Sequence, residues 1–273
     1  WINGAMGKMG AELISYLKDN ETIKITGVVS PSHSGQEVTA QNAMLTIAKD
    51  LESLSSGADF PDVIVDFSIA QAGYDAAIFS AKNNICFVSG TTGFSEKQTQ
   101  EIQTAFDNSS AQAIIAPNFS VGVVLMMEFS AKAAPFFEDI EIVETHHKTK
   151  KDAPSGTAKK TAQMIIDKRA SEGIKTNDIP MHSLRLSGAI AHQQVHLSSQ
   201  GEVLRIEHDA NNRSCFMPGV VLSIEKVIEQ NQFIEQLKKN NIPYYNQKKN
   251  INIANQDKTI VVLYHILQFM LRE

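Results

Sequence analysis

Short apolar runs alternate with helix-like segments in the first half of the chain, and this alternation limits the possible folds more than any other feature. Residues 63–67, 85–89 and 111–116 are strand-like, whereas residues 70–82 and a segment ending near Phe106 have helical character. Continuous apolar runs of this length are typical of parallel strands buried on both faces. Strands that alternate with helices indicate βαβ units. We therefore expect a doubly wound α/β domain at the start of the chain.

The chain begins with a strand end, a glycine-rich turn and an amphipathic helix. The turn reads G-A-M-G-K-M-G over residues 4–10, and Leu13, Ile14 and Leu17 recur at helical spacing behind it. Glycine lets the backbone approach a pyrophosphate, and the start of a helix supplies N–H groups. The spacing differs from the usual G-x-G-x-x-G, so it indicates a dinucleotide site only together with the βαβ pattern. Because the three residues before Gly4 are too few for a first strand, we expect some N-terminal residues to be missing from this numbering.

The end of the second expected strand bears on the choice of cofactor. Residues 23–29 form this strand, and the sequence V-V-S-P-S-H over residues 28–33 closes it without a carboxylate. Folds that select NAD place Asp or Glu here to bind the ribose 2′-hydroxyl. Serine and histidine side chains can instead bind a 2′-phosphate, although an ordinary polar turn would have the same composition. We therefore expect NADPH to be tolerated.

Polar loops follow the later strands of this domain. G-T-T-G occupies residues 90–93, and P-N-F-S occupies residues 117–120. Ligands of doubly wound sheets bind at the carboxyl ends of the strands. Both loops are therefore candidates for the nicotinamide side of the site, with an ordinary turn between strand and helix as the alternative.

The pattern changes after Asn118, which indicates a second domain. A helix over about residues 121–134 and a strand over residues 140–145 precede a helix over residues 158–169. Longer strand-like segments follow at residues 182–186, 194–198 and 202–208. These elements predict an α+β domain with an open, mostly antiparallel or mixed sheet and helices on one face.

The chain then enters a helix over about residues 220–229, which we expect to return to the first domain. A polar tail over residues 231–273 ends in an apolar segment. The expected organisation is a dinucleotide-binding domain over residues 1–118, completed by about residues 220–273, and a second domain over residues 119–219.

Composition disfavours several classes of protein. The 273 residues carry a formal net charge of −5, which gives no reason to expect nucleic acid as a partner. Two cysteines, Cys86 and Cys215, are too few for a disulfide framework and fit a reducing compartment. No signal-peptide pattern opens the chain, and the longest apolar run, residues 260–271, is too short to span a bilayer. We expect a cytoplasmic protein with no membrane partner.

The residues richest in chemistry lie between 144 and 157, which read E-T-H-H-K-T-K-K-D-A-P-S-G-T. Strand alternation places Ile142, Glu144 and His146 on one face of the preceding strand. His147 then points to the other face, so the two histidines need not share a role. Histidine can bind an anion when charged or donate a proton in catalysis, although a single strand histidine is more often structural.

Three lysines, Lys148, Lys150 and Lys151, follow the histidines. Lysine can act as an acid when neighbouring positive charge or burial lowers its pKa, although a run of charges is usually a solvated face. Residues 152–158, D-A-P-S-G-T-A, have the features of a helix start, which binds a carboxylate well. A metal site is the other option for paired histidines, but the adjacent lysines would repel a cation. We expect no metal and a small anionic substrate that is held and protonated.

These residues closely resemble the signature of a known family. Residues 144–158 are similar to the central motif of the 4-hydroxy-tetrahydrodipicolinate reductase (dihydrodipicolinate reductase) family. Similar blocks occur in family order over about residues 1–230: G-A-M-G-K-M-G, V-D-F-S, S-G-T-T-G-F, A-P-N-F-S-V-G-V, I-P-M-H-S-L-R-L-S-G, I-E-H-D and F-M-P-G-V. Residues 191–193 read A-H-Q where many members read G-E-H, and the tail after about residue 230 departs from the usual family ending.

The resemblance implies a reductase of a small dicarboxylate that uses NADH or NADPH in lysine and diaminopimelate biosynthesis. It also implies a Rossmann-like first domain and a homotetramer assembled through the substrate-binding second domain. Lys150 matches the family's proton donor, and His146 matches the histidine assigned to acid catalysis or to polarising the substrate. His147 matches a histidine that contacts one substrate carboxylate. The loop that holds the other carboxylate is matched by Ser155, Gly156 and Thr157. The cofactor-binding residues implied are Gly4, Gly7, Lys8, Met9, Gly10, Phe67, Gly90, Thr91, Thr92, Pro117, Asn118 and Phe119.

We therefore expect an NAD(P)H-dependent reductase in which domain closure precedes hydride transfer. One rival interpretation is another two-domain NAD(P) oxidoreductase, such as an amino-acid or semialdehyde dehydrogenase, which gives no reason for the twin-histidine, lysine and P-S-G-T block. The other is a dinucleotide sensor without catalysis, against which the intact His146, His147 and Lys150 argue.

Overall fold

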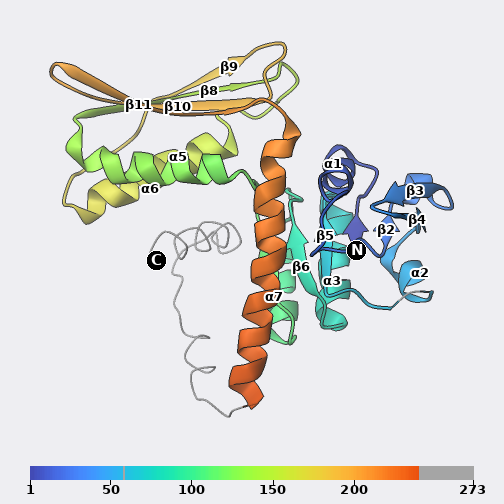
Figure 1. Cartoon of the computed structure of the whole chain (residues 1–273). Coiled ribbons are helices and arrows are strands. Elements are labelled where there is room, and N and C mark those ends of the chain that lie inside the picture. The colour runs from blue at the N-terminus through green and yellow to red at the C-terminus, as the bar shows by residue number, and fades with distance from the viewer. Residues whose placement is uncertain (58, 240–273) are drawn as a thin grey trace. The chain divides into compact units, whose positions relative to one another are not determined.

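The structure is a computed structural model that describes residues 1–57 and 59–239 (Figure 1). The chain divides into two compact units. Among the described residues, the first unit contains Trp1–Phe119 and residues 216–239, and the second contains Ser120–Cys215. Each unit is built around its own main sheet.

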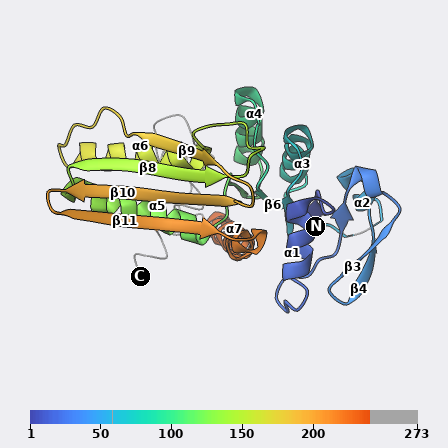
Figure 2. The ribbon, with the colours of Figure 1, turned by 90° about the horizontal axis from the view of Figure 1, so that it is seen from above.

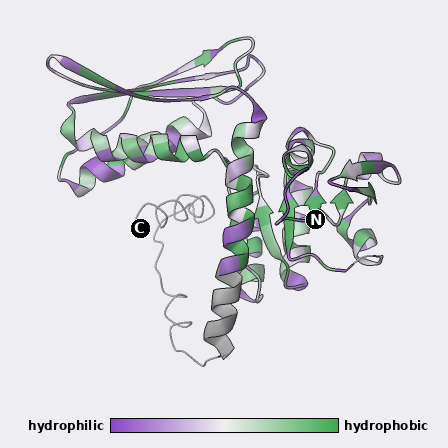
Figure 3. Ribbon diagram, in the orientation of Figure 1, coloured by the Kyte–Doolittle hydropathy of each residue, from purple (hydrophilic) through white to green (hydrophobic). Residues whose placement is uncertain are grey.

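Five parallel strands form the sheet of the first unit, in the order β2-β1-β5-β6-β7. They are β1 (Ile2–Asn3), β2 (Val28–Val29), β5 (Val63–Asp66), β6 (Cys86–Ser89) and β7 (Ala113–Ile115). Every residue of β5 and β6 is buried, which explains why these runs lack polar alternation. Figure 3 shows the same strands as a hydrophobic centre. The expected Rossmann-like sheet is confirmed.

Helices cover both faces of this sheet (Figure 2). On one face, α3 (Ala70–Lys82) packs against β5 and β6 and beside α4 (Glu96–Asp107). On the other, α7 (Met217–Lys239) packs against the same strands and beside α1 (Lys8–Tyr16). The helix expected over residues 220–229 is thus longer, and residues 231–239 are helical instead of belonging to a polar tail. The apolar segment over residues 260–271 lies outside the described residues.

The second strand is shorter than its apolar residues predict, because side chains occupy the backbone groups that precede Val28. The N–H of Ile25 donates to Gln41 Oε1 (3.1 Å), and Gln41 Nε2 donates to the carbonyl oxygen of Ile23 (2.7 Å). Asn20 Oδ1 accepts from the N–H of Ile23 (2.7 Å). The prediction of a strand over residues 23–29 was therefore wrong in length, because β2 contains only Val28–Val29. The chain after it forms a hairpin of β3 (Glu37–Ala40) and β4 (Ala43–Thr46), followed by α2 (Leu51–Ser55).

The second unit has a four-stranded sheet in the order β11-β10-β8-β9. Its elements are α5 (Val121–Ala133), β8 (Asp139–His146), α6 (Gly156–Ser171), β9 (Met181–Arg185), β10 (Ala191–Ser199) and β11 (Glu202–Ala210). β8 and β9 are parallel and the other pairs are antiparallel, so the expected mixed sheet is confirmed. α5 and α6 lie on one face (Figure 1), where Ile142, Ile165, Val195 and Leu197 form the core. Within the described residues, no helix is long and apolar enough to cross a membrane.

Candidate functional site

Loops that follow β1, β5, β6 and β7 meet at one edge of the sheet of the first unit, because these strands are parallel neighbours. The predicted cofactor residues in these loops are Gly4, Gly7, Phe67, Gly90, Thr91, Thr92, Pro117, Asn118 and Phe119. The others, Lys8, Met9 and Gly10, start α1. The structure thus brings the predicted positions together at the carboxyl edge of the strands, where doubly wound sheets bind ligands.

Two glycines make the first turn possible. Gly4 has a φ of +78°, a left-handed conformation that residues with a side chain avoid, and a Cβ there would lie 2.5 Å from the carbonyl oxygen of Phe67. A Cβ on Gly10 would lie under 3.0 Å from the backbone of Gly4. The N-cap of α1 is Gly7, which has no side chain to occupy the first N–H groups of the helix. These residues fit a dinucleotide, whose pyrophosphate the start of α1 would hold.

A buried carboxylate links three of these loops. Asp66, the last residue of β5, accepts hydrogen bonds from Asn3 Nδ2 (2.9 Å), Ser68 Oγ (2.5 Å) and Ser89 Oγ (2.7 Å). The N–H of Thr91 donates to Ser89 Oγ (3.1 Å). Asn3 and Ser89 end β1 and β6, so one buried group fixes the loops after three neighbouring strands. The sequence predicts Asp66 as part of a strand, but Asp66 is not among the predicted site residues.

The turn after β2 carries hydroxyl and imidazole groups in place of a carboxylate. Ser30 Oγ and Ser32 Oγ lie 3.1 and 2.9 Å from His33 Nδ1. A ribose 2′-phosphate would find hydrogen-bond donors in this turn, which agrees with the expectation that NADPH is tolerated.

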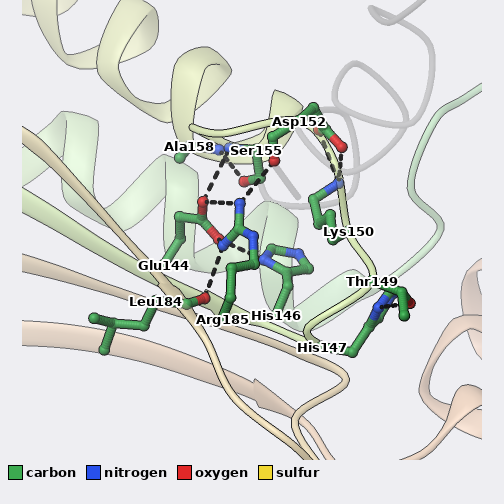
Figure 4. Close-up of polar contacts among 10 residues, drawn as sticks. All are labelled: Glu144, His146, His147, Thr149, Lys150, Asp152, Ser155, Ala158, Leu184 and Arg185. Atoms are coloured by element: carbon green, nitrogen blue, oxygen red, sulfur yellow. Dashed lines mark hydrogen bonds and ion pairs between the residues drawn. The ribbon is translucent and has the colours of Figure 1, made fainter.

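The predicted catalytic and substrate-binding residues of the second unit lie between the last residue of β8 and the first turn of α6. Figure 4 shows His146, His147, Lys150 and Ser155 among them. His146 ends β8, and Ser155 is the N-cap of α6. Between them the N–H of Lys150 donates to the carbonyl oxygen of His147 (3.1 Å), which closes a tight turn. The peptide bond between Ala153 and Pro154 is cis.

Glu144 is fully buried at the base of this connection. Arg185 donates from Nη2 to Oε1 and from Nη1 to Oε2, each at 2.9 Å. The N–H of Ser155 donates to Oε1 (3.2 Å), and His146 Nδ1 lies 2.5 Å from Oε2. Burial alone would raise the pKa of Glu144, but the hydrogen bonds, that from Arg185 above all, lower it to about 2. Glu144 is therefore ionised at neutral pH.

The charge on Glu144 decides which ring nitrogen of His146 carries the proton. An ionised carboxylate can only accept, so His146 must donate to it through Nδ1–H. Burial lowers the pKa of His146, and the hydrogen bond to Glu144 opposes this only in part. The ring is therefore neutral at neutral pH, and its Nε2 presents a lone pair.

Lys150 and His147 lie on different sides of the turn (Figure 4). Lys150 Nζ donates to both carboxylate oxygens of Asp152 at 2.8 Å, and its side chain is 22% exposed. This hydrogen bonding lowers the pKa of Asp152. His147 is exposed, and its Nδ1 lies 2.8 Å from Thr149 Oγ1, away from the Glu144–Arg185 pair. Lys150 is therefore joined to His147 by a backbone hydrogen bond, and its side chain pairs with Asp152.

The helix α6 begins at Gly156, two residues before the position that the sequence predicts. Ser155 Oγ accepts from the N–H of Ala158 (3.1 Å) and caps the helix. Gly156 and Thr157 consequently lie in the first turn of α6 and not in a loop before it. The first-turn N–H groups and the positive end of the helix dipole suit a carboxylate.

Three residues around this connection were not among the predicted site residues: Glu144, Asp152 and Arg185. Strand alternation did place Glu144 on the face of Ile142, and a carboxylate in that buried row is a signal for a buried partner. The partner itself, Arg185, lies 41 residues further along the chain, and the parallel pairing of β8 and β9 sets it beside His146. No local pattern in the sequence reveals that pairing.

Comparison with known protein families gives the same result for both units. The model described as "Dihydrodipicolinate reductase, N-terminus" matches residues 1–119, and that described as "Dihydrodipicolinate reductase, C-terminus" matches residues 122–240. A 4-hydroxy-tetrahydrodipicolinate reductase from Synechocystis sp. is 36% identical over 263 residues, which covers 87% of this chain and 96% of the relative. One from Bacillus subtilis is 36% identical over 251 residues, covering 85% and 94%.

Solved structures agree with these relatives. A dipicolinate-bound dihydrodipicolinate reductase from Paenisporosarcina sp. TG-14 matches with a TM-score of 0.70 and 36% identity, over 84% of this chain and 93% of that one. A myo-inositol dehydrogenase from Corynebacterium glutamicum matches with a TM-score of 0.62 but 11% identity, over 85% and 88%, and so shares the fold alone. The resemblance carried by residues 144–158 is thus confirmed over both units: the chain belongs to the 4-hydroxy-tetrahydrodipicolinate reductase (dihydrodipicolinate reductase) family.

Proposed function

We propose that this protein reduces 4-hydroxy-tetrahydrodipicolinate to tetrahydrodipicolinate with NADH or NADPH, as a step of lysine and diaminopimelate biosynthesis. The observation that carries the proposal is the connection from β8 to α6. It groups a partly buried lysine, a partly buried histidine and a capped helix start within the family signature. This is the set of groups that a small dicarboxylate requires if it is to be held and protonated.

The residues of the second unit divide the work between binding and proton transfer. The N–H groups at Gly156 and Thr157 and the hydroxyl of Thr157 bind one carboxylate, and His147 binds the other. The 4-hydroxyl group leaves as water, and reduction then adds one hydride and one proton to the ring. When bound, the nicotinamide supplies the hydride. Lys150 supplies the proton, because the neutral His146 presents a lone pair at Nε2 and serves to orient the substrate.

The role of Lys150 is tested by Lys150→Ala. A positioned proton donor contributes about 10²- to 10⁴-fold to the rate, so we expect kcat to fall by that order. The dissociation constant for NADPH should stay as in the wild type, because the predicted cofactor residues belong to the first unit. The measurement is NADPH oxidation with the product of dihydrodipicolinate synthase as substrate. Lys151→Ala, at the exposed neighbouring lysine, is the matched control and should keep the wild-type kcat; an unchanged kcat in Lys150→Ala would contradict the role.

The carboxylate-binding role of the first turn of α6 predicts a different kinetic signature. Thr157→Val removes a hydroxyl but no charge, so it should raise KM for the substrate more than it lowers kcat. Thr157→Ser keeps the hydroxyl and should restore most of the affinity. A fall in kcat at unchanged KM in Thr157→Val would assign the residue to the chemical step instead.

We further propose that the protein is a cytoplasmic homotetramer assembled through the second unit. The face of its sheet opposite α5 and α6 supports this, because no described element of that unit covers it (Figure 2). It carries cross-strand pairs, such as His182 with Glu141 (2.8 Å), beside exposed apolar residues, such as Leu184 and Val203. Mixed faces of this kind suit contacts between identical copies.

A further inference from the structure

Arg185 connects three segments around the candidate catalytic residues. Besides its two bonds to Glu144, its Nη2 donates to the carbonyl oxygen of Asp152 (2.7 Å), and its Nη1 donates to that of Leu184 (2.7 Å). One guanidinium thus joins β8, the end of β9 and the turn that carries Lys150 (Figure 4). Planar bidentate pairing of this kind fixes geometry as well as charge.

Glu144 has no oxygen left for a substrate. Each carboxylate oxygen accepts at least two hydrogen bonds, from Arg185 and Ser155 at one and from Arg185 and His146 at the other. The Ser183 side chain is a further hydrogen-bond partner of Glu144. A carboxylate offers about four lone-pair positions, and all are occupied. Its side chain is also fully buried. Any effect of Glu144 on catalysis must therefore pass through the groups that it holds.

Those groups belong to both halves of the proposed site. His146 is the ring that orients the substrate, and the N–H of Ser155 opens the helix start that binds a carboxylate. The same carboxylate therefore sets the orientation of the ring and the distance from β8 to α6. Loss of it would disturb substrate orientation and substrate binding together.

We propose that Glu144 and Arg185 act as one positioning pair, which holds His146 as the Nδ1–H tautomer and keeps the start of α6 at a fixed distance from that ring. The proposal rests on the proposed function of the site. It assigns neither residue to contact with the substrate. It explains why a buried carboxylate with a partly buried arginine lies under the signature sequence, where an apolar core would otherwise continue from Ile142.

The kinetic test compares Glu144→Gln, Arg185→Met and the double variant. Misplacement of reacting groups by about 1 Å can lower the rate about 100-fold, so each single variant should lose about that factor in kcat and also show a raised KM for the substrate. Because the two residues act as a unit, the double variant should lose no more than the worse single variant. The dissociation constant for NADPH should be unchanged in all three.

A structural readout separates positioning from a general loss of stability. The ring nitrogens of His146 should give the NMR shifts of the Nδ1–H tautomer in the wild type at neutral pH and lose that signature in Glu144→Gln. This readout needs no turnover, so it tests the pair even if the wild type fails to reduce the proposed substrate. Such a failure would count against the proposed function alone.

Two further variants keep the test decisive. Glu172→Gln removes an exposed ion pair with Lys168 (2.6 Å) at the other end of α6 and should behave as the wild type. Arg185→Lys keeps the positive charge but cannot form the bidentate hydrogen bonds to Glu144. This variant replaces Glu144→Gln in the test if Glu144→Gln does not fold. Wild-type kcat, KM and His146 tautomer in Arg185→Lys and in any folded Glu144 variant would overturn the proposal.

Discussion

At the scale of single residues, Glu144 couples the stability of the fold to pH. Its pKa is about 2 in the folded chain against 4.5 as an ordinary value, so between these pH values the unfolded chain binds more protons than the folded one. The contribution of Glu144 to the free energy of unfolding is fully present above about pH 4.5 and is lost as the pH falls toward 2. A shift of this size corresponds to about 3 kcal/mol. We expect the free energy of unfolding to drop by that order over this interval.

The measurement is urea unfolding of the wild type and Glu144→Gln across the same pH range. The glutamine has no proton to bind, so its free energy of unfolding should change less with pH than that of the wild type. Glu172→Gln, at an exposed glutamate, should retain the full slope. Equal slopes in the wild type and Glu144→Gln would show that other carboxylates account for the acid sensitivity.

The same residues show how far sequence reasoning reaches into the site. His146, Lys150 and Ser155 could be selected because they are adjacent in the chain, and the structure does place them in one connection. Arg185 could not be selected in this way. Its contact with Glu144 depends on the register between two parallel strands, which the packing of the whole sheet sets.

At the scale of elements, apolar periodicity predicted the strands of both main sheets and the helices beside them. Helix α3 has the expected bounds, Ala70–Lys82, because its alanines and long side chains favour a helix and outweigh the single interior glycine, Gly73. The length predicted for β2 was wrong, because the side chains of Asn20 and Gln41 bind the backbone groups that a neighbouring strand would have used. The apolar pattern of the sequence predicts which residues are buried, but it does not predict which groups form hydrogen bonds with the backbone N–H and C=O groups.

Helix α7 supports the loop after β7 through Gly219. A Cβ at this position would lie under 3.0 Å from the carbonyl group of Phe119, a predicted cofactor residue in the same unit. In Gly219→Ala the helix or the loop must move, and overpacking of this kind costs about 1–3 kcal/mol. We therefore expect a lower midpoint of thermal unfolding and a raised KM for NADPH, with KM for the substrate changed less.

The matched control is Gly57→Ala, because nothing lies within 4 Å of a Cβ at that position and its φ needs no glycine. This variant should keep the wild-type KM for NADPH and the wild-type midpoint. Wild-type values in Gly219→Ala would mean that the close approach of α7 to Phe119 does not shape the cofactor loop.

At the scale of the whole molecule, the two units carry different parts of the proposed reaction. The predicted cofactor residues lie in the first unit, and the predicted proton donor and carboxylate-binding residues lie in the second. Variants of the second unit should therefore alter substrate kinetics without altering the dissociation constant for NADPH. The sequence indicated two architectures because strand–helix alternation gives way after Asn118 to long strands in succession.

The open face of the second sheet predicts the assembly of the protein. Leu184 and Val203 are 45% and 51% exposed on that face in the single chain, and contact with identical copies would bury them. Replacing both by lysine places charges where the sheets would meet, and desolvation of unpaired charges should dissociate the proposed tetramer into smaller species. Phe136→Lys is the control, because this residue is 82% exposed just after α5, on the helix side of the same unit. Sedimentation velocity should report a tetramer for the wild type and the control but not for the double variant; a tetramer in all three would place the interface elsewhere.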